Sequence, residues 1–242
     1  MKHINTQYVE NLSHILASNA DKENAGNMKK YMKDQFPFFG IKSPQRKVIF
    51  RQFIKNEGYP SILELKEVVQ TLYDKPEREL HYFAMELVDK YAKKLDVQGI
   101  KLLEHIIVKR SWWDTVDYIA VNCLGSYFRM HPEMIRPVTA VWMNSGNIWL
   151  QRSCILFQLK YKKDTNLELL YSFIVDLKQS NEFFIQKAIG WILREYSKIN
   201  PNEVLRFAGS IQLKPLSYRE ATRIINKKNA LSGENEEGTN NL

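Results

Sequence analysis

The sequence predicts an all-α fold, an α-solenoid built from pairs of helices. Apolar residues follow a helical period along nearly the whole chain, and no clear alternating strand pattern appears. Segments of similar sequence also recur at a spacing of 35 residues. Helix pairs that repeat at such a spacing stack on their neighbours into a solenoid.

The repeat is clearest in the second half of the chain. Residues 149–163 align with residues 184–198, so that Arg152 matches Lys187 and Tyr161 matches Tyr196. The segments that begin at 44, 79, 114 and 219 fall at the same phase. Prolines early in "SPQR", "KPERE" and "HPEM" are typical of helix starts. We therefore expect about six helix pairs in one domain over residues 1–230, followed by a disordered tail over residues 231–242.

The composition favours a protein that meets a polyanion in a reducing compartment. The chain has 242 residues and a net charge of +8, which indicates nucleic acid or an anionic surface as a partner. Cys123 and Cys154 lie in apolar stretches and are expected in the core. The chain shows no signal peptide, membrane span, metal-ligand cluster or glycine-rich phosphate loop, so we expect a cytoplasmic protein without metal or cofactor.

Each repeat helix has one apolar face that is expected in the core. The opposite face carries basic and aromatic residues. In residues 184–198 the apolar stripe is Ile185, Ile189, Ile192 and Tyr196, and the opposite face carries Lys187, Trp191, Arg194 and Lys198. Asp117, Arg152 and Lys187 share one position in three successive repeats, and Trp113 lies one turn before Asp117. Trp112 is therefore expected to pack against the rest of the protein.

Two interpretations of this face stay open at this point. The tryptophans and Asp117 can form a functional strip, since a carboxylate would be out of place in a surface that only binds phosphate. Alternatively, Trp113 and Trp191 fill gaps between repeats and Asp117 pairs with Arg152.

Several long blocks resemble the AlkD family of bacterial DNA alkylation-repair glycosylases. They are "KKYMKDQFPFFGIKSPQR", "SWWDTVD", "NIWLQRSCILFQLKYK" and "EFFIQKAIGWILREY", and the resemblance covers roughly residues 25–225. It implies a right-handed solenoid of HEAT-like repeats with a concave basic face that cups duplex DNA. It also implies catalytic roles for Trp113, Trp191 and Asp117, and DNA-binding roles for Arg152 and Tyr31. Lys187, Arg194, Lys160 and Lys47 are expected to extend the contact with the DNA backbone.

The implied activity is hydrolysis of the N-glycosidic bond of cationic N3- or N7-alkylated purines in duplex DNA, by a monomer and without base flipping. The chief alternative is a non-catalytic HEAT-like protein that binds damaged or branched DNA. A protein-interaction solenoid is a third interpretation. Lyase activity through Lys160 or Lys187 is not expected, because exposed lysines on a basic face normally contact phosphates.

Overall fold

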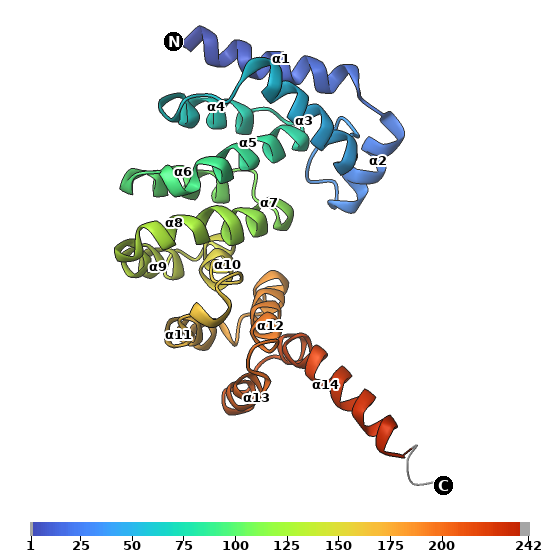
Figure 1. Cartoon of the computed structure of the whole chain (residues 1–242), viewed down its shortest axis with the longest axis vertical. Helices are drawn as coiled ribbons and strands as arrows, with labels where there is room; N and C mark the ends of the chain where they lie inside the picture. The colour runs from blue at the N-terminus through green and yellow to red at the C-terminus, as the bar shows by residue number, and fades with distance from the viewer. Residues whose placement is uncertain (1, 238–242) are drawn as a thin grey trace. The chain divides into compact units, whose positions relative to one another are not determined.

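The computed structural model describes the backbone of residues 2–237 and the side chains of residues 6–227. Over this part of the chain the secondary structure is helical and no strand occurs. The chain divides into two compact units, residues 1–119 and residues 120–242. Each unit is a stack of helices, and Figure 1 labels them in chain order.

The first unit holds the helices up to the middle of the chain. Its α-helices are α1 (Lys2–Ser18), α2 (Lys22–Tyr31), α3 (Ser43–Glu57), α4 (Ile62–Asp74), α5 (Arg78–Tyr91), α6 (Ile100–Val108) and α7 (Trp113–Tyr118). Short 3-10 turns at Ala92–Lys94 and Val97–Gly99 join α5 to α6. Helix α5 packs against both α4 and α7, and its residues are buried from Arg78 to Met85. It is therefore the central helix of this unit.

The second unit begins within a π-helical stretch at Ile119–Leu124. Its α-helices are α8 (Gly125–Met130), α9 (Ile135–Met143), α10 (Ile148–Leu156), α11 (Leu167–Leu177), α12 (Phe183–Tyr196), α13 (Pro201–Ser210) and α14 (Pro215–Glu237). Further 3-10 turns lie at Pro132–Met134 and Lys162–Asp164. Helix α12 packs against α10, α13 and α14, so it has the central place in this unit that α5 has in the first.

The predicted helical repeat is confirmed. Each of the six aligned segments contains a helix, namely α3, α5, α7, α10, α12 and α14. In α12 the predicted apolar stripe is buried at Ile185, Ile189 and Ile192, as a helix with one core-facing stripe requires. The right-handed winding and the concave face stay predictions, as does the single domain over residues 1–230.

Two boundaries differ from the prediction. Helix α10 ends at Leu156, and the rest of the segment expected to be helical up to residue 163 forms turns. Helix α14 continues to Glu237, so that residues 231–237 are helical where a disordered tail was expected. Residues 238–242 of that tail lie outside the described residues. Among the described helices, none has the length and apolarity to cross a bilayer.

Candidate functional site

The two adjacent tryptophans belong to different backbone conformations. Trp113 is the first residue of α7, whereas Trp112 precedes the helix in an extended conformation with φ −159° and ψ 160°. The carbonyl of Trp112 accepts the first helical hydrogen bond, from the amide of Val116 at 3.0 Å. The helix therefore begins at Trp113. Because the backbone changes direction between them, the two indoles are not successive positions on one helical face.

Trp113 and Asp117 lie one turn apart on α7, as predicted. Both side chains are half-buried. Residues four apart on a helix are neighbours on its surface, so that a ligand over this face of α7 meets an indole and a carboxylate together.

Tyr31 meets Trp113 within the first unit. It lies at the end of α2, its side chain is 68% exposed, and its ring centroid is 6.0 Å from that of Trp113 at an interplanar angle of 75°. This edge-to-face geometry is a favourable aromatic arrangement. A shallow pocket of about 260 Å³, lined by Met28, Met32 and other mainly apolar neighbours, lies beside Tyr31. The structure thus brings two predicted site residues from separate helices into contact.

Asp114, the other carboxylate of the SWWDTVD block, was not assigned a role from the sequence. Its carboxylate accepts hydrogen bonds from Nε and Nη2 of Arg78 at 2.9 and 2.6 Å, and from the hydroxyl of Tyr82 at 2.7 Å. Arg78 is 0% exposed, so this is a buried ion pair. The sequence gives one signal for a structural role of Asp114. It is an acidic residue in the first turn of a helix, where the backbone amides favour negative charge.

Burial and neighbouring charges shift several pKa values around this ion pair. Burial, followed by the charge of Arg78, lowers the pKa of His81 to about 4. Burial and the nearby charge of Asp114 raise the pKa of Tyr82 above its ordinary value, so the phenol stays protonated and donates to the carboxylate. Burial also raises the pKa of Glu86, against the opposing charges of Arg46 and Lys47.

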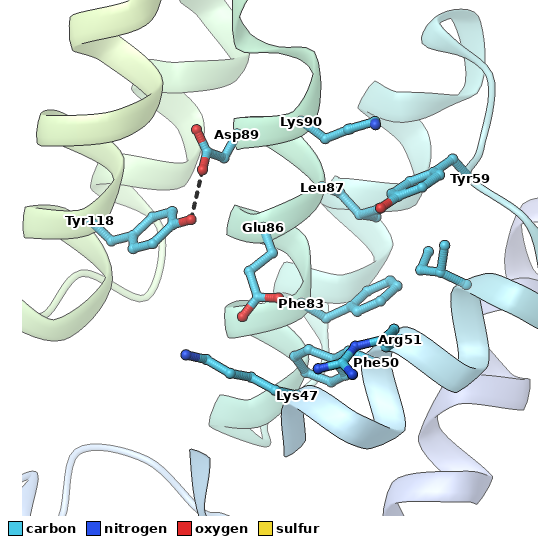
Figure 2. Close-up of a pocket in the computed structure, with 11 residues that line it drawn as sticks. Lys47, Phe50, Arg51, Tyr59, Phe83, Glu86, Leu87, Asp89, Lys90 and Tyr118 are labelled. Atoms are coloured by element: carbon cyan, nitrogen blue, oxygen red, sulfur yellow. Dashed lines mark hydrogen bonds between the residues drawn. The ribbon is translucent and has the colours of Figure 1, made fainter. Parts of the chain in front are cut away.

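Lys47 lines a separate groove of about 550 Å³ on the first unit. Figure 2 shows Lys47 and Arg51 of α3 on one side of this groove and Glu86, Asp89 and Lys90 of α5 on the other. The charges are therefore mixed, since two carboxylates accompany three cations. Lys47 is exposed and can reach a polyanion, and its role as a DNA contact stays a prediction.

In the second unit, two predicted basic residues of α12 converge on a carboxylate that the sequence analysis missed. Nζ of Lys187 lies 2.8 Å from Oε1 of Glu220 in α14, and Nη1 of Arg194 pairs with Oε2 of the same carboxylate. Nη1 of Arg223 approaches it at 4.0 Å. The hydrogen bond from Lys187, supported by the charges of Lys187 and Arg194, holds the pKa of Glu220 below its usual value despite burial.

The 35-residue offset could not reveal this contact. It projects Lys187 onto Thr222, two residues beyond Glu220, and residues two apart point to different sides of a helix. The contact depends instead on how α12 crosses α14. Trp191 lies on α12 between the two cations in sequence and is half-buried. The second unit therefore presents an indole beside a partly neutralised basic cluster.

The two remaining predicted residues, Arg152 and Lys160, differ from each other in burial. Arg152 is 4% exposed, and its Nη1 donates to the backbone carbonyl of Phe184 at the start of α12. Arg152 is therefore buried, although it shares its repeat position with the half-buried Asp117 and Lys187. Lys160 is exposed and donates to Oδ1 of Asn122 at 2.7 Å. DNA-binding roles for both residues stay predictions.

Two comparisons with known proteins agree on one family. The family model for the DNA alkylation repair enzyme matches residues 12–225. A solved structure described as a predicted DNA alkylation repair enzyme from Enterococcus faecalis is similar over 84% of this chain and 95% of its own, with 33% sequence identity and a TM-score of 0.78. A comparison with curated proteins finds no match.

Proposed function

Because the chain belongs to the DNA alkylation repair enzyme family, we propose that it is a DNA glycosylase. Its substrates are purines alkylated at N3 or N7 in duplex DNA, and it hydrolyses their N-glycosidic bond. The observation that carries the proposal is the pairing of Trp113 with Asp117 one turn apart on α7, with Tyr31 against the same indole.

These residues fit the chemistry of a cationic base. Alkylation at N3 or N7 gives the purine a positive charge, so that the electrons of the C1′–N bond neutralise the base as it leaves, and no general acid is required. The sugar becomes oxocarbenium-like, and a nearby carboxylate stabilises this charge. Asp117 supplies the carboxylate and can orient a water molecule whose oxygen adds to C1′ while its proton passes to solvent.

Aromatic residues complete the proposed sugar-binding surface. The face of an indole attracts a cation with about 0.5–2 kcal/mol, which favours Trp113 and Trp191 as neighbours of the deoxyribose. Tyr31 is the matching contact to the DNA backbone on the first unit. Arg152, Lys187, Arg194, Lys160 and Lys47 are the proposed phosphate contacts. Because the protein recognises the lesion through the sugar and its charge, the damaged base stays in the stack and is not flipped out of the duplex.

The test is the Asp117→Asn variant with methylated duplex DNA. The amide is almost isosteric but carries no charge, so base release should fall by about 10- to 1000-fold while affinity for undamaged duplex is retained. Released base is measured by chromatography in single-turnover reactions. Base release at the wild-type rate would remove Asp117 from the mechanism. Tight binding by a wild-type protein that releases no base would favour the non-catalytic alternative.

A further inference from the structure

Helix α7, which carries Trp113 and Asp117, is the start of a helical segment that continues without a break into the π-helical turns at Ile119–Leu124. Its regular part spans only six residues, Trp113–Tyr118, and the chain is extended at Trp112 just before it. Contacts with the neighbouring helix α5 therefore help to fix its rotation about its own axis. The proposed reaction depends on that rotation, because it decides where the indole and the carboxylate point.

At its first turn, α7 is held by α5 through the Arg78–Asp114 ion pair. An arginine side chain has five N–H donors, and each has an acceptor here. Nε and Nη2 donate to Asp114, Nη2 also to Oγ1 of Thr115 at 2.8 Å, and Nη1 to the carbonyl of Arg110 at 2.7 Å and towards Nδ1 of His81 at 3.2 Å. We call this group, with the hydroxyl of Tyr82 on Asp114, the first anchor.

The first anchor also fixes the chain that leads into α7. Arg110 adopts a left-handed conformation with φ 53°, which costs a non-glycine residue free energy and persists only where its surroundings impose it. Its carbonyl is one of the acceptors of Arg78. The guanidinium in turn lies 3.8 Å above the ring of Phe36. The entry into α7 is therefore fixed together with its first turn.

At its other end, α7 is held by α5 through Tyr118. The hydroxyl of Tyr118 donates to Oδ2 of Asp89 at 2.7 Å, as the dashed line in Figure 2 shows. We call this contact the second anchor. It lies one helical turn of α7 beyond Asp114, so that both turns of this short helix are attached to the same neighbour.

The sequence positions of the anchors relate them to the candidate site. The anchoring residues of α7, Asp114 and Tyr118, are four apart, and so are Trp113 and Asp117. Each candidate residue precedes an anchoring residue by one position, which corresponds to a rotation of about 100° around the helix. We propose that the two anchors from α5 fix the rotation of α7 and thereby aim Trp113 and Asp117; the catalytic consequence rests on the proposed glycosylase activity.

Three tyrosines allow a matched test. Tyr82→Phe removes one hydrogen bond from the first anchor, and Tyr118→Phe removes the hydrogen bond of the second. Tyr91→Phe is the control, because Tyr91 is also on α5 but donates to the carbonyl of Pro60 at 2.6 Å, away from α7. All three changes delete a single hydroxyl.

The position of Trp113 can be followed independently of activity by 19F NMR of protein that contains 5-fluorotryptophan, with the Trp113 resonance assigned from a Trp113→Phe variant. Tyr82→Phe and Tyr118→Phe should shift or broaden that resonance. They should also lower single-turnover base release by roughly 10-fold, since about 1 Å of misplacement can cost about 100-fold. Affinity for undamaged duplex should stay within about 3-fold. Tyr91→Phe should match the wild type in all three measurements.

The outcomes separate the two proposals. A Trp113 resonance that is unchanged in both anchor variants would overturn the inference, as would an equal change in Tyr91→Phe. If the wild type released no base, the proposed glycosylase activity would be wrong. The Trp113 resonance would still decide whether the two anchors fix the rotation of α7.

Discussion

At the scale of single residues, two carboxylates hold cations close to the candidate residues. Asp114 pairs with the buried Arg78, and Glu220 pairs with the half-buried Lys187 and Arg194. Tyr31 lies against Trp113. Both ion pairs join residues more than 25 positions apart, so no local sequence pattern predicts them.

Trp112→Ala and Trp113→Ala should have different effects. Nε1 of Trp112 is buried, so truncation of this half-buried side chain should cost about 3 kcal/mol of unfolding free energy. Trp113 mainly loses its contact with Tyr31, worth about 1 kcal/mol, but its loss should strongly reduce base release. Thermal unfolding and single-turnover base release measure the two effects. If Trp113→Ala unfolds the protein and Trp112→Ala is stable but inactive, the functional indole has been assigned to the wrong residue.

His81 should make stability fall in mild acid. Its pKa is about 4 in the folded protein against 6.5 for the free side chain, so the unfolded chain binds the proton more tightly. Its stabilising contribution is complete above pH 6.5 and is lost as the pH falls towards 4, at up to about 1.4 kcal/mol per pH unit.

The check is urea unfolding of the wild type and His81→Gln between pH 4 and 7. Glutamine keeps a hydrogen-bond donor and acceptor but does not titrate in this range. The variant should therefore lose less stability over the acidic half of the range. Parallel curves for the two proteins would show that His81 is not the group responsible.

At the scale of elements, the 35-residue period predicts which segments are helical but not where short helices end. The segment from residue 114 forms α7, the π-helical turns at Ile119–Leu124 and the start of α8, and α10 ends before the aligned segment does. Helix propensity is a weak guide that tertiary contacts override, so the period alone does not locate such boundaries. The period also does not predict how α12 crosses α14. This crossing decides which carboxylate pairs with Lys187 and Arg194.

The close packing of α12 on α14 can be tested at Gly190. A Cβ atom there would lie 2.4 Å from Cβ of Glu220 and 3.0 Å from the carbonyl oxygen of Ser217. Gly190→Ala should therefore lower the free energy of unfolding by about 1–3 kcal/mol. Gly209→Ala in α13 is the control, because its Cβ would meet no atom within 4 Å. Urea unfolding should show the control unchanged or stabilised by up to about 1 kcal/mol. Equal losses in both variants would contradict the packing.

At the scale of the whole molecule, the net charge of +8 predicts affinity for DNA but not where the duplex binds. The carboxylate of Glu220 partly neutralises the basic cluster of α12, so the charge available to phosphates is smaller than the sequence suggests.

Glu220→Gln tests whether this basic cluster meets DNA. Loss of the carboxylate frees Lys187 and Arg194 for phosphates, so duplex affinity should rise and the salt dependence of log K should steepen by about one unit, at some cost in thermal stability. Glu203→Gln is the control with the same charge change, because Glu203 pairs with Arg206 in α13. Fluorescence anisotropy across a salt series measures both. Equal effects in the two variants would mean that only net charge matters.

The central claim is that this protein excises alkylated purines, and release of free base tests it most directly. Purified wild-type protein and Asp117→Asn are incubated with N-methylated duplex DNA, and free methylated purines are separated from the DNA and quantified. The account predicts time-dependent release of N3-methyladenine or N7-methylguanine by the wild type and a release at least about 10-fold slower by the variant. No release above that of DNA without protein, under conditions where the duplex is bound, would contradict it.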